Sequence, residues 1–187
     1  MSSTEVFRRI IAALDEAGIP HMLTGSFASS FHGLTRATQD IDLVIAPTES
    51  QIRDLVSRLS PEVYYVDLEA ALDALRRRSQ FNIIDLDTGW KVDLIVRRDR
   101  PFSVQEFERR QEIDFSGIRL AVATAEDVIL AKLEWATLGS SQRQIEDVAG
   151  ILQLRNEEVN QEYIEDWVAK LGLDEAWKQA RRLAGID

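Results

Sequence analysis

The chain has 187 residues, of which 45% are hydrophobic and 29% are charged, a balance typical of a globular protein and not of a disordered or fibrous one. Its formal charge of −10 argues against coating of duplex DNA, and no stretch approaches the roughly 20 apolar residues that span a bilayer. The absence of cysteine excludes disulfides and thiolate metal sites. Because the N-terminal stretch lacks the pattern of a secretory signal, we expect a cytoplasmic protein without membrane insertion.

The first sixty residues predict helices and strands in alternation. A helix is expected over residues 4–17, where apolar side chains recur at helical spacing before a Gly-Ile-Pro sequence. A short apolar strand over 19–23 then leads to a short helix over 27–32. Residues 40–45 alternate and then become wholly apolar, which indicates a strand whose start alone is exposed. An amphipathic helix over 48–59 follows.

The middle of the chain predicts a hairpin, a strand and a helix. Segments 81–86 and 90–96 flank Asp87-Thr88-Gly89, in which glycine can take the positive φ of a tight turn. Residues 118–122 form another short strand. A threonine and two acidic residues then begin a helix expected at about 125–137.

The last quarter of the chain predicts helices alone, near 141–154, 160–171 and 173–184. The expected fold is therefore α+β, with a C-terminal helical bundle. We expect a core over 1–124 and a helical region over 125–187 packed on that core. Three tryptophans in helical segments are expected to lie in the core: Trp135, Trp167 and Trp177.

Two aspartates open the strand at 40–45, and a third lies inside the strand at 90–96. Alternate residues of a strand point to one face, so Asp40 and Asp42 project together about 7 Å apart. Asp93 stands between valine and leucine, where an aspartate without a partner or a metal is costly. Hard divalent cations suit carboxylate ligands best, so these three aspartates are the expected ligands of Mg²⁺.

The Gly25-Ser26 pair precedes a short helix and can bind phosphate, because it offers backbone N–H groups, a hydroxyl and a helix N-terminus. An ordinary turn with a helix cap is the alternative interpretation. A second Asp-x-Asp pair, Asp85 with Asp87, runs directly into the Thr88-Gly89 turn. Since aspartate caps such turns, we interpret this second pair as structural.

Three parts of the sequence, namely Gly25-Ser26, Arg36-Ala-Thr-Gln-Asp-Ile-Asp42 and Lys91-Val-Asp93, resemble the nucleotidyltransferases of the DNA polymerase β superfamily. The resemblance is to the AbiEii-type branch in particular, which includes toxins of bacterial abortive-infection and toxin–antitoxin systems. Members of that branch also carry a helix with a lysine followed by a basic and acidic helix. Lys132 and the segment Arg143 to Asp147 resemble these helices in order and rough spacing.

This resemblance spans roughly residues 19–150 and implies an α+β fold with a short mixed β-sheet backed by helices. It also implies transfer of a nucleoside monophosphate from a nucleoside triphosphate (NTP) to an acceptor hydroxyl, with release of pyrophosphate. It implies that Asp40 and Asp42 hold two Mg²⁺ ions. Asp93 would bind one of these ions and help to deprotonate the acceptor. All three aspartates are therefore expected to be both catalytic and metal-binding residues.

The resemblance also implies a binding site for the NTP. Gly25-Ser26 would hold the β- and γ-phosphates, while Arg36 and Lys132 would neutralise charge on the triphosphate. Plainer alternatives exist for the helical residues, since Lys132 could be exposed and Asp147 could pair with Arg143.

The sequence leaves the acceptor open among a tRNA end, a protein hydroxyl and a small molecule. Toxin-like transfer ranks first, and it would imply an antitoxin protein as partner. One alternative is a non-catalytic nucleotide-binding or regulatory partner that keeps the fold. The other is a nucleotidyltransferase of aminoglycoside type, which the acidic charge of the chain would suit.

Overall fold

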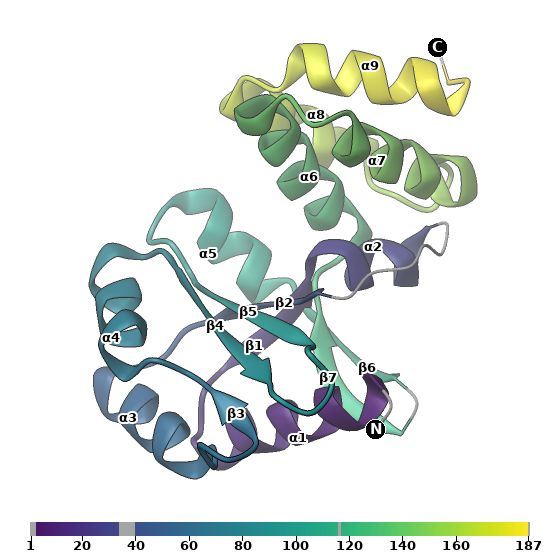
Figure 1. Ribbon diagram of the computed structural model, residues 1–187. Coiled ribbons are helices and arrows are strands. Elements are labelled where there is room, and N and C mark those ends of the chain that lie inside the picture. Colours follow the sequence, from purple (N-terminus) through teal and green to yellow (C-terminus); the bar gives the residue numbers. More distant parts are fainter. Residues whose placement is uncertain (1–2, 34–39, 116, 187) are drawn as a thin grey trace. The chain divides into compact units, whose positions relative to one another are not determined.

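Figure 1 shows the computed structural model of the protein, which describes residues 3–33, 40–115 and 117–186. The described residues fall into two compact units. The sheet unit contains residues 3–23 and 40–122, and the helical unit contains residues 24–33 and 123–186.

The segment 24–33 belongs to the helical unit although strands of the sheet lie on both sides of it in the sequence. No linker or change of composition marks this segment, so the sequence does not indicate the grouping. The expectation of a core over 1–124 with the region 125–187 packed on it stays a prediction.

In the described residues the sheet has seven strands, namely β1 (His21–Thr24), β2 (Asp40–Ile45), β3 (Tyr64–Tyr65), β4 (Gln80–Asp85), β5 (Lys91–Val96), β6 (Gln111–Phe115) and β7 (Ile118–Val122). Their order across the sheet is β3-β4-β5-β2-β1-β7-β6 (Figure 1). β2 runs parallel to β5 and β1 runs parallel to β7, whereas the pairs β3–β4, β4–β5 and β6–β7 are antiparallel. This mixed sheet confirms the predicted α+β fold class.

The described helices of the sheet unit are α1 (Ser3–Glu16), α3 (Glu49–Arg58), α4 (Leu68–Arg77) and α5 (Pro101–Glu108). α1 packs on α3, α3 packs on α4, and α4 packs on β4. Ile10 and Leu14 of α1 and Ile52 and Leu55 of α3 are completely buried. Burial of these apolar stripes is the main stabilising contribution of the two helices. The sequence predicts α1 and α3 but assigns no element to α4, α5, β3 or β6.

The described helices of the helical unit are α2 (Gly25–His32), α6 (Ala125–Gly139), α7 (Gln142–Arg155), α8 (Gln161–Leu171) and α9 (Asp174–Ala184). α6 packs against α7 and α8, α7 packs against α9, and α2 contacts both α6 and α7 (Figure 1). The four C-terminal helices confirm the predicted bundle, and α2 adds a helix to it. Among the described helices, none has both the length and the apolar composition needed to cross a membrane.

Two of the three tryptophans lie where the sequence predicts. Trp167 and Trp177 are buried, with 7% and 6% of their surface exposed. The prediction for Trp135 is wrong, because half of its surface (50%) is exposed. α6 has apolar residues around most of its circumference, so apolar neighbours in the sequence do not identify its buried side.

Gly33 ends α2 at a place where the backbone of α7 leaves no room for a side chain. A Cβ atom at Gly33 would lie 2.9 Å from Ile151 Cγ1 and 3.0 Å from the Ile151 backbone nitrogen. We therefore expect Gly33→Ala to lower the free energy of unfolding by about 1–3 kcal/mol, because the backbone of α7 must move. Gly139→Ala is the matched control, since a Cβ atom there would meet nothing within 4 Å. Equal stability of the two variants, measured by urea denaturation, would contradict this close approach.

The environment of His32 makes the free energy of unfolding depend on pH. Its ring Nε2 lies 2.7 Å from the Ala123 carbonyl oxygen, to which it must donate, and its buried Nδ1 has no hydrogen-bond partner among the described residues. Burial lowers the pKa of His32 from 6.5, and the positive charge of Arg155 lowers it further, although the Ala123 hydrogen bond and Glu126 oppose this effect. The unfolded chain therefore takes up a proton at a higher pH than the folded chain does.

We expect the contribution of His32 to stability to be complete above pH 6.5 and to decline as the pH falls below that value. Urea denaturation of the wild type and of His32→Gln at pH 5.5 and pH 7.5 tests this. Glutamine can donate the same hydrogen bond to Ala123 but does not titrate, so the variant should lose less stability on acidification. Parallel losses in both proteins would show that His32 does not cause the effect.

Candidate active site

The register of β2 and β5 brings the predicted aspartates together. Asp42 lies directly opposite Asp93, and Asp40 lies directly opposite Lys91. Because alternate residues of a strand share a face, these four side chains project from the same face of the sheet. We call this surface the carboxylate face and define it by Asp40, Asp42, Lys91 and Asp93.

The other face of the same two strands is apolar. Ile41, Leu43, Val92 and Leu94 are each at most 1% exposed. A slip of one residue in the register would exchange these side chains with the carboxylates, so burial of the apolar face fixes the position of the aspartates. Of the three aspartates on the carboxylate face, Asp93 is the most enclosed, with 8% of its surface exposed.

Lys91 supplies a positive charge to the carboxylate face. Its Nζ lies 2.8 Å from Asp93 Oδ2 and 3.9 Å from Asp40 Oδ1. The hydrogen bond to Asp93, with the negative charges of all three aspartates, raises the pKa of Lys91. The sequence names Lys91 only as part of the Lys-x-Asp pattern. Its spacing of two from Asp93 is the signal that places both on one face.

The three aspartates fit a divalent metal by chemistry and by strand position, but their side chains are not gathered around a metal position. No group of three or more carboxylate, imidazole or thiol side chains within residues 3–33, 40–115 and 117–186 forms a metal-binding cluster. Asp40, Asp42 and Asp93 all offer carboxylate oxygens, the ligand type that Mg²⁺ prefers. The strand register thus suits a metal, and the ammonium of Lys91 contacts two of the carboxylates, those of Asp40 and Asp93.

Asp85, the first residue of the second Asp-x-Asp pair, has the structural role that the sequence predicts. Asp85 accepts hydrogen bonds from the backbone N–H and the hydroxyl of Thr88, at 2.9 and 2.7 Å, within the turn between β4 and β5. It also lies 3.3 Å from Arg9 on α1. The Asp85 carboxylate therefore stabilises the turn between β4 and β5 and links it to α1.

Gly25 and Ser26 are the first residues of α2, which follows β1 without an intervening loop. Gly25 has a φ of +63°, in the left-handed region that glycine adopts without strain. The backbone N–H groups of the first turn of an α-helix have no partner within the helix itself, so they are suited to an anion. The other predicted phosphate ligand, Arg36, lies outside the described residues.

Lys132 lies inside the helical unit, on the side of α6 that faces α7. Its Nζ is 2.7 Å from Asp147 Oδ2 and 3.0 Å from Gln144 Oε1, and the side chains of Lys132 and Asp147 are 4% and 8% exposed. Lys132 is thus buried and not exposed. Lys132, from another helix, forms an ion pair with Asp147, a contact that spacing along one helix cannot reveal. A role of Lys132 in binding the NTP stays a prediction.

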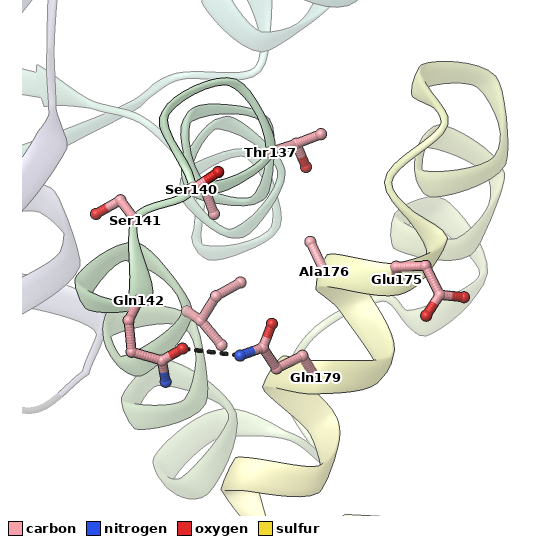
Figure 2. A pocket seen from close by; sticks show the side chains of 9 residues that line it. Thr137, Ser140, Ser141, Gln142, Glu175, Ala176 and Gln179 are labelled. Carbon is pink, nitrogen blue, oxygen red and sulfur yellow. Dashed lines mark hydrogen bonds between the residues drawn. The ribbon is translucent and has the colours of Figure 1, made fainter.

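A pocket of about 380 Å³ lies between the α6–α7 connection and α9 (Figure 2). A hydrogen bond of 2.8 Å from Gln179 to Gln142 runs along its edge. Its lining combines hydroxyl and amide side chains, such as Ser140 and Gln179, with apolar ones such as Ala136 and Ile145. None of the residues that the sequence predicts for catalysis or nucleotide binding lines this pocket.

Three solved structures share this fold over 81% to 97% of the chain. The solution structure of the antibiotic-resistance factor ANT(2'')-Ia has a TM-score of 0.56 at 18% identity, covering 97% of this chain and 98% of that one. The lincosamide antibiotic adenylyltransferase LnuA, with lincomycin bound, has a TM-score of 0.54 at 11% identity, covering 81% and 96%. An antigenic nucleotidyltransferase-like protein from Paracoccidioides brasiliensis has a TM-score of 0.54 at 17% identity, covering 91% and 90%. The chain has a nucleotidyltransferase fold.

The sequence as a whole shows no corresponding similarity to nucleotidyltransferases. No protein-family profile matches the sequence, and no curated protein is significantly similar to it. The similarity therefore lies in the arrangement of helices and strands, and it confirms the fold that the resemblance of short motifs implies.

Proposed function

We propose that the protein is a Mg²⁺-dependent nucleotidyltransferase that moves a nucleoside monophosphate from an NTP to an acceptor hydroxyl. One observation carries the proposal: Asp42 and Asp93 are paired across neighbouring strands on a nucleotidyltransferase fold, with Asp40 on the same face. Both NTPs and Mg²⁺ are cytoplasmic reagents, so the cytoplasm is the proposed location.

In the proposed reaction the acceptor oxygen attacks the α-phosphorus of the NTP. A new P–O bond forms, the bond between the α-phosphorus and its bridging oxygen breaks, and pyrophosphate leaves. Asp93, the most enclosed of the three carboxylates, would take the proton of the acceptor hydroxyl. Asp40 and Asp42 would hold the two Mg²⁺ ions with it. Bound Mg²⁺ would supply charge neutralisation at the phosphates.

Phosphate binding is proposed for the start of α2. Ser26 would donate its hydroxyl, and the backbone N–H groups of the first turn would bind the β- and γ-phosphates. The positive φ of Gly25 supports this role, because the absence of a side chain permits close approach of an anion. Arg36 and Lys132 are proposed to neutralise charge on the triphosphate.

A small molecule is the acceptor that the comparisons favour. LnuA is an adenylyltransferase of a lincosamide antibiotic, and ANT(2'')-Ia is an antibiotic-resistance factor; each matches this chain over at least 96% of its own length. The charge of −10 also suits a cationic acceptor. A toxin-like transfer to RNA or protein, with an antitoxin partner, rests on the AbiEii-type sequence pattern alone.

The test is transfer of radioactive label. Purified protein is incubated with Mg²⁺, each α-³²P-labelled NTP and a total cell extract, and label is sought in small molecules, protein and RNA. We expect label in the small-molecule fraction. Label in RNA or protein instead would favour the toxin-like role, and Asp93→Asn should abolish labelling in every case. Mg²⁺-dependent nucleotide binding without transfer would favour the non-catalytic alternative and contradict the proposal.

A further inference from the structure

We propose that Lys91 is a built-in counter-cation that occupies the carboxylate face in the absence of a divalent metal and is displaced when the metal binds. This inference rests on the proposed function, since it concerns the same three aspartates. It goes beyond that function because it gives the protein a metal affinity and a metal-free stability that depend on a residue outside the metal ligands.

Lys91 lies on the same face of the sheet as the three aspartates. Lys91 begins β5 opposite Asp40 and two residues before Asp93, so its side chain rises from the same face as all three carboxylates. Its Nζ is within hydrogen-bond distance of Asp93, at 2.8 Å, and 3.9 Å from Asp40. One ammonium thus contacts carboxylates of both strands that would supply metal ligands.

The Lys91 ammonium also balances negative charge on the carboxylate face. Like charges directly opposite each other in a sheet are destabilising, and Asp42 and Asp93 occupy such a pair of positions. The Asp93 side chain is only 11% exposed, so water compensates it poorly. The Lys91 ammonium compensates this charge, which lets the face form without a metal.

The Lys91 ammonium and a divalent cation compete for the same carboxylate. A divalent cation bound to Asp93 and the Lys91 ammonium would be two positive charges within a few ångströms at the same carboxylate. Metal binding therefore requires that Nζ leave the Asp93 oxygen. The Lys91 side chain is 38% exposed, so it has solvent into which it can move. Displacement of Lys91 thus weakens metal binding to the free protein.

The experiment measures Mn²⁺ binding by calorimetry and thermal unfolding, with the full chain and no nucleotide. Lys91→Met removes the ammonium, and Lys91→Gln keeps a hydrogen-bond donor without the charge. Lys178→Met is the matched control, because it removes an equal charge from an ion pair on α9, where Lys178 Nζ lies 3.0 Å from Glu175. Asp93→Asn shows whether the Mn²⁺ bound is held by the carboxylate face.

We expect both Lys91 variants to bind Mn²⁺ about tenfold more tightly than the wild type. In EDTA both should unfold at a lower temperature than the wild type, and saturating Mn²⁺ should close most of that gap. Lys178→Met should bind Mn²⁺ as the wild type does.

Unchanged or weaker Mn²⁺ binding by both Lys91 variants would overturn the inference and leave the proposed function in place, provided that Asp93→Asn still abolishes binding. Wild-type protein that binds no Mn²⁺, or binds it equally well after Asp93→Asn, would overturn both. Because affinity and unfolding are read without turnover, neither result depends on knowing the acceptor.

Discussion

Asp42→Asn is expected to reduce nucleotide transfer about a thousandfold or more, which corresponds to roughly 4 kcal/mol of transition-state stabilisation. The substitution keeps the size of the side chain but removes one of the charges that would hold the metal ions. Stability should change by less than about 1 kcal/mol, because Asp42 is only half-buried and faces the like charge of Asp93. Transfer of label at saturating NTP measures the loss of activity, and urea denaturation measures the change in stability.

The matched control for this prediction is Asp87→Asn. Asp87 is exposed in the turn between β4 and β5, so the same chemical change there leaves the carboxylate face intact. Its transfer rate should equal that of the wild type. An Asp42→Asn protein that is stably folded and still transfers at more than a tenth of the wild-type rate would show that the carboxylate face is not the catalytic site.

The sequence predicts the part of this face that depends on one strand at a time. A period of two in β2 and β5 places Asp40 beside Asp42 and marks Asp93 as a costly residue in an apolar strand, and the structure has these strands as predicted. What local periodicity cannot give is which strands are neighbours. The direct opposition of Asp42 and Asp93 follows from the parallel pairing of β2 with β5, a long-range property of the fold.

Lys91 illustrates this limit. In the sequence it is one charged residue at the start of a strand, which usually means a solvated end. Only the pairing of β5 with β2 sets it against Asp40 as well as Asp93. The short elements β3 and α5 were beyond prediction for another reason: with two and eight residues, they contain too few repeats of any period to stand out.

The grouping of α2 with the C-terminal helices has a similar origin. The segment from Gly25 to His32 carries few apolar residues and shows no linker on either side. Its place is set by contacts distant in sequence, such as the hydrogen bond from His32 to Ala123 and the one from Arg155 to the His32 carbonyl oxygen. Such contacts join residues about a hundred positions apart, and no pattern in a short window of sequence encodes them.

Lys132→Met is expected to destabilise the protein more than Gly33→Ala or Asp42→Asn does. It leaves the Asp147 carboxylate, 8% exposed, without the ammonium that lies 2.7 Å away. Removing one partner of a buried ion pair costs about 3–5 kcal/mol, because the other charge stays buried without that partner. For a chain of this length the midpoint of thermal unfolding should fall by roughly 6–20 °C. Lys170→Met is the control, since its ion pair with Asp166 is exposed.

The double variant Lys132→Met with Asp147→Leu separates the structural role of this lysine from its proposed role at the NTP. Replacing both charges by apolar side chains removes the buried carboxylate as well as the ammonium, so most of the lost stability should return. A double variant no more stable than Lys132→Met would contradict the ion-pair explanation. Its transfer rate then decides the second role. A stable double variant that transfers at the wild-type rate would contradict nucleotide binding by Lys132, whereas a stable variant with a raised KM for the NTP would support it.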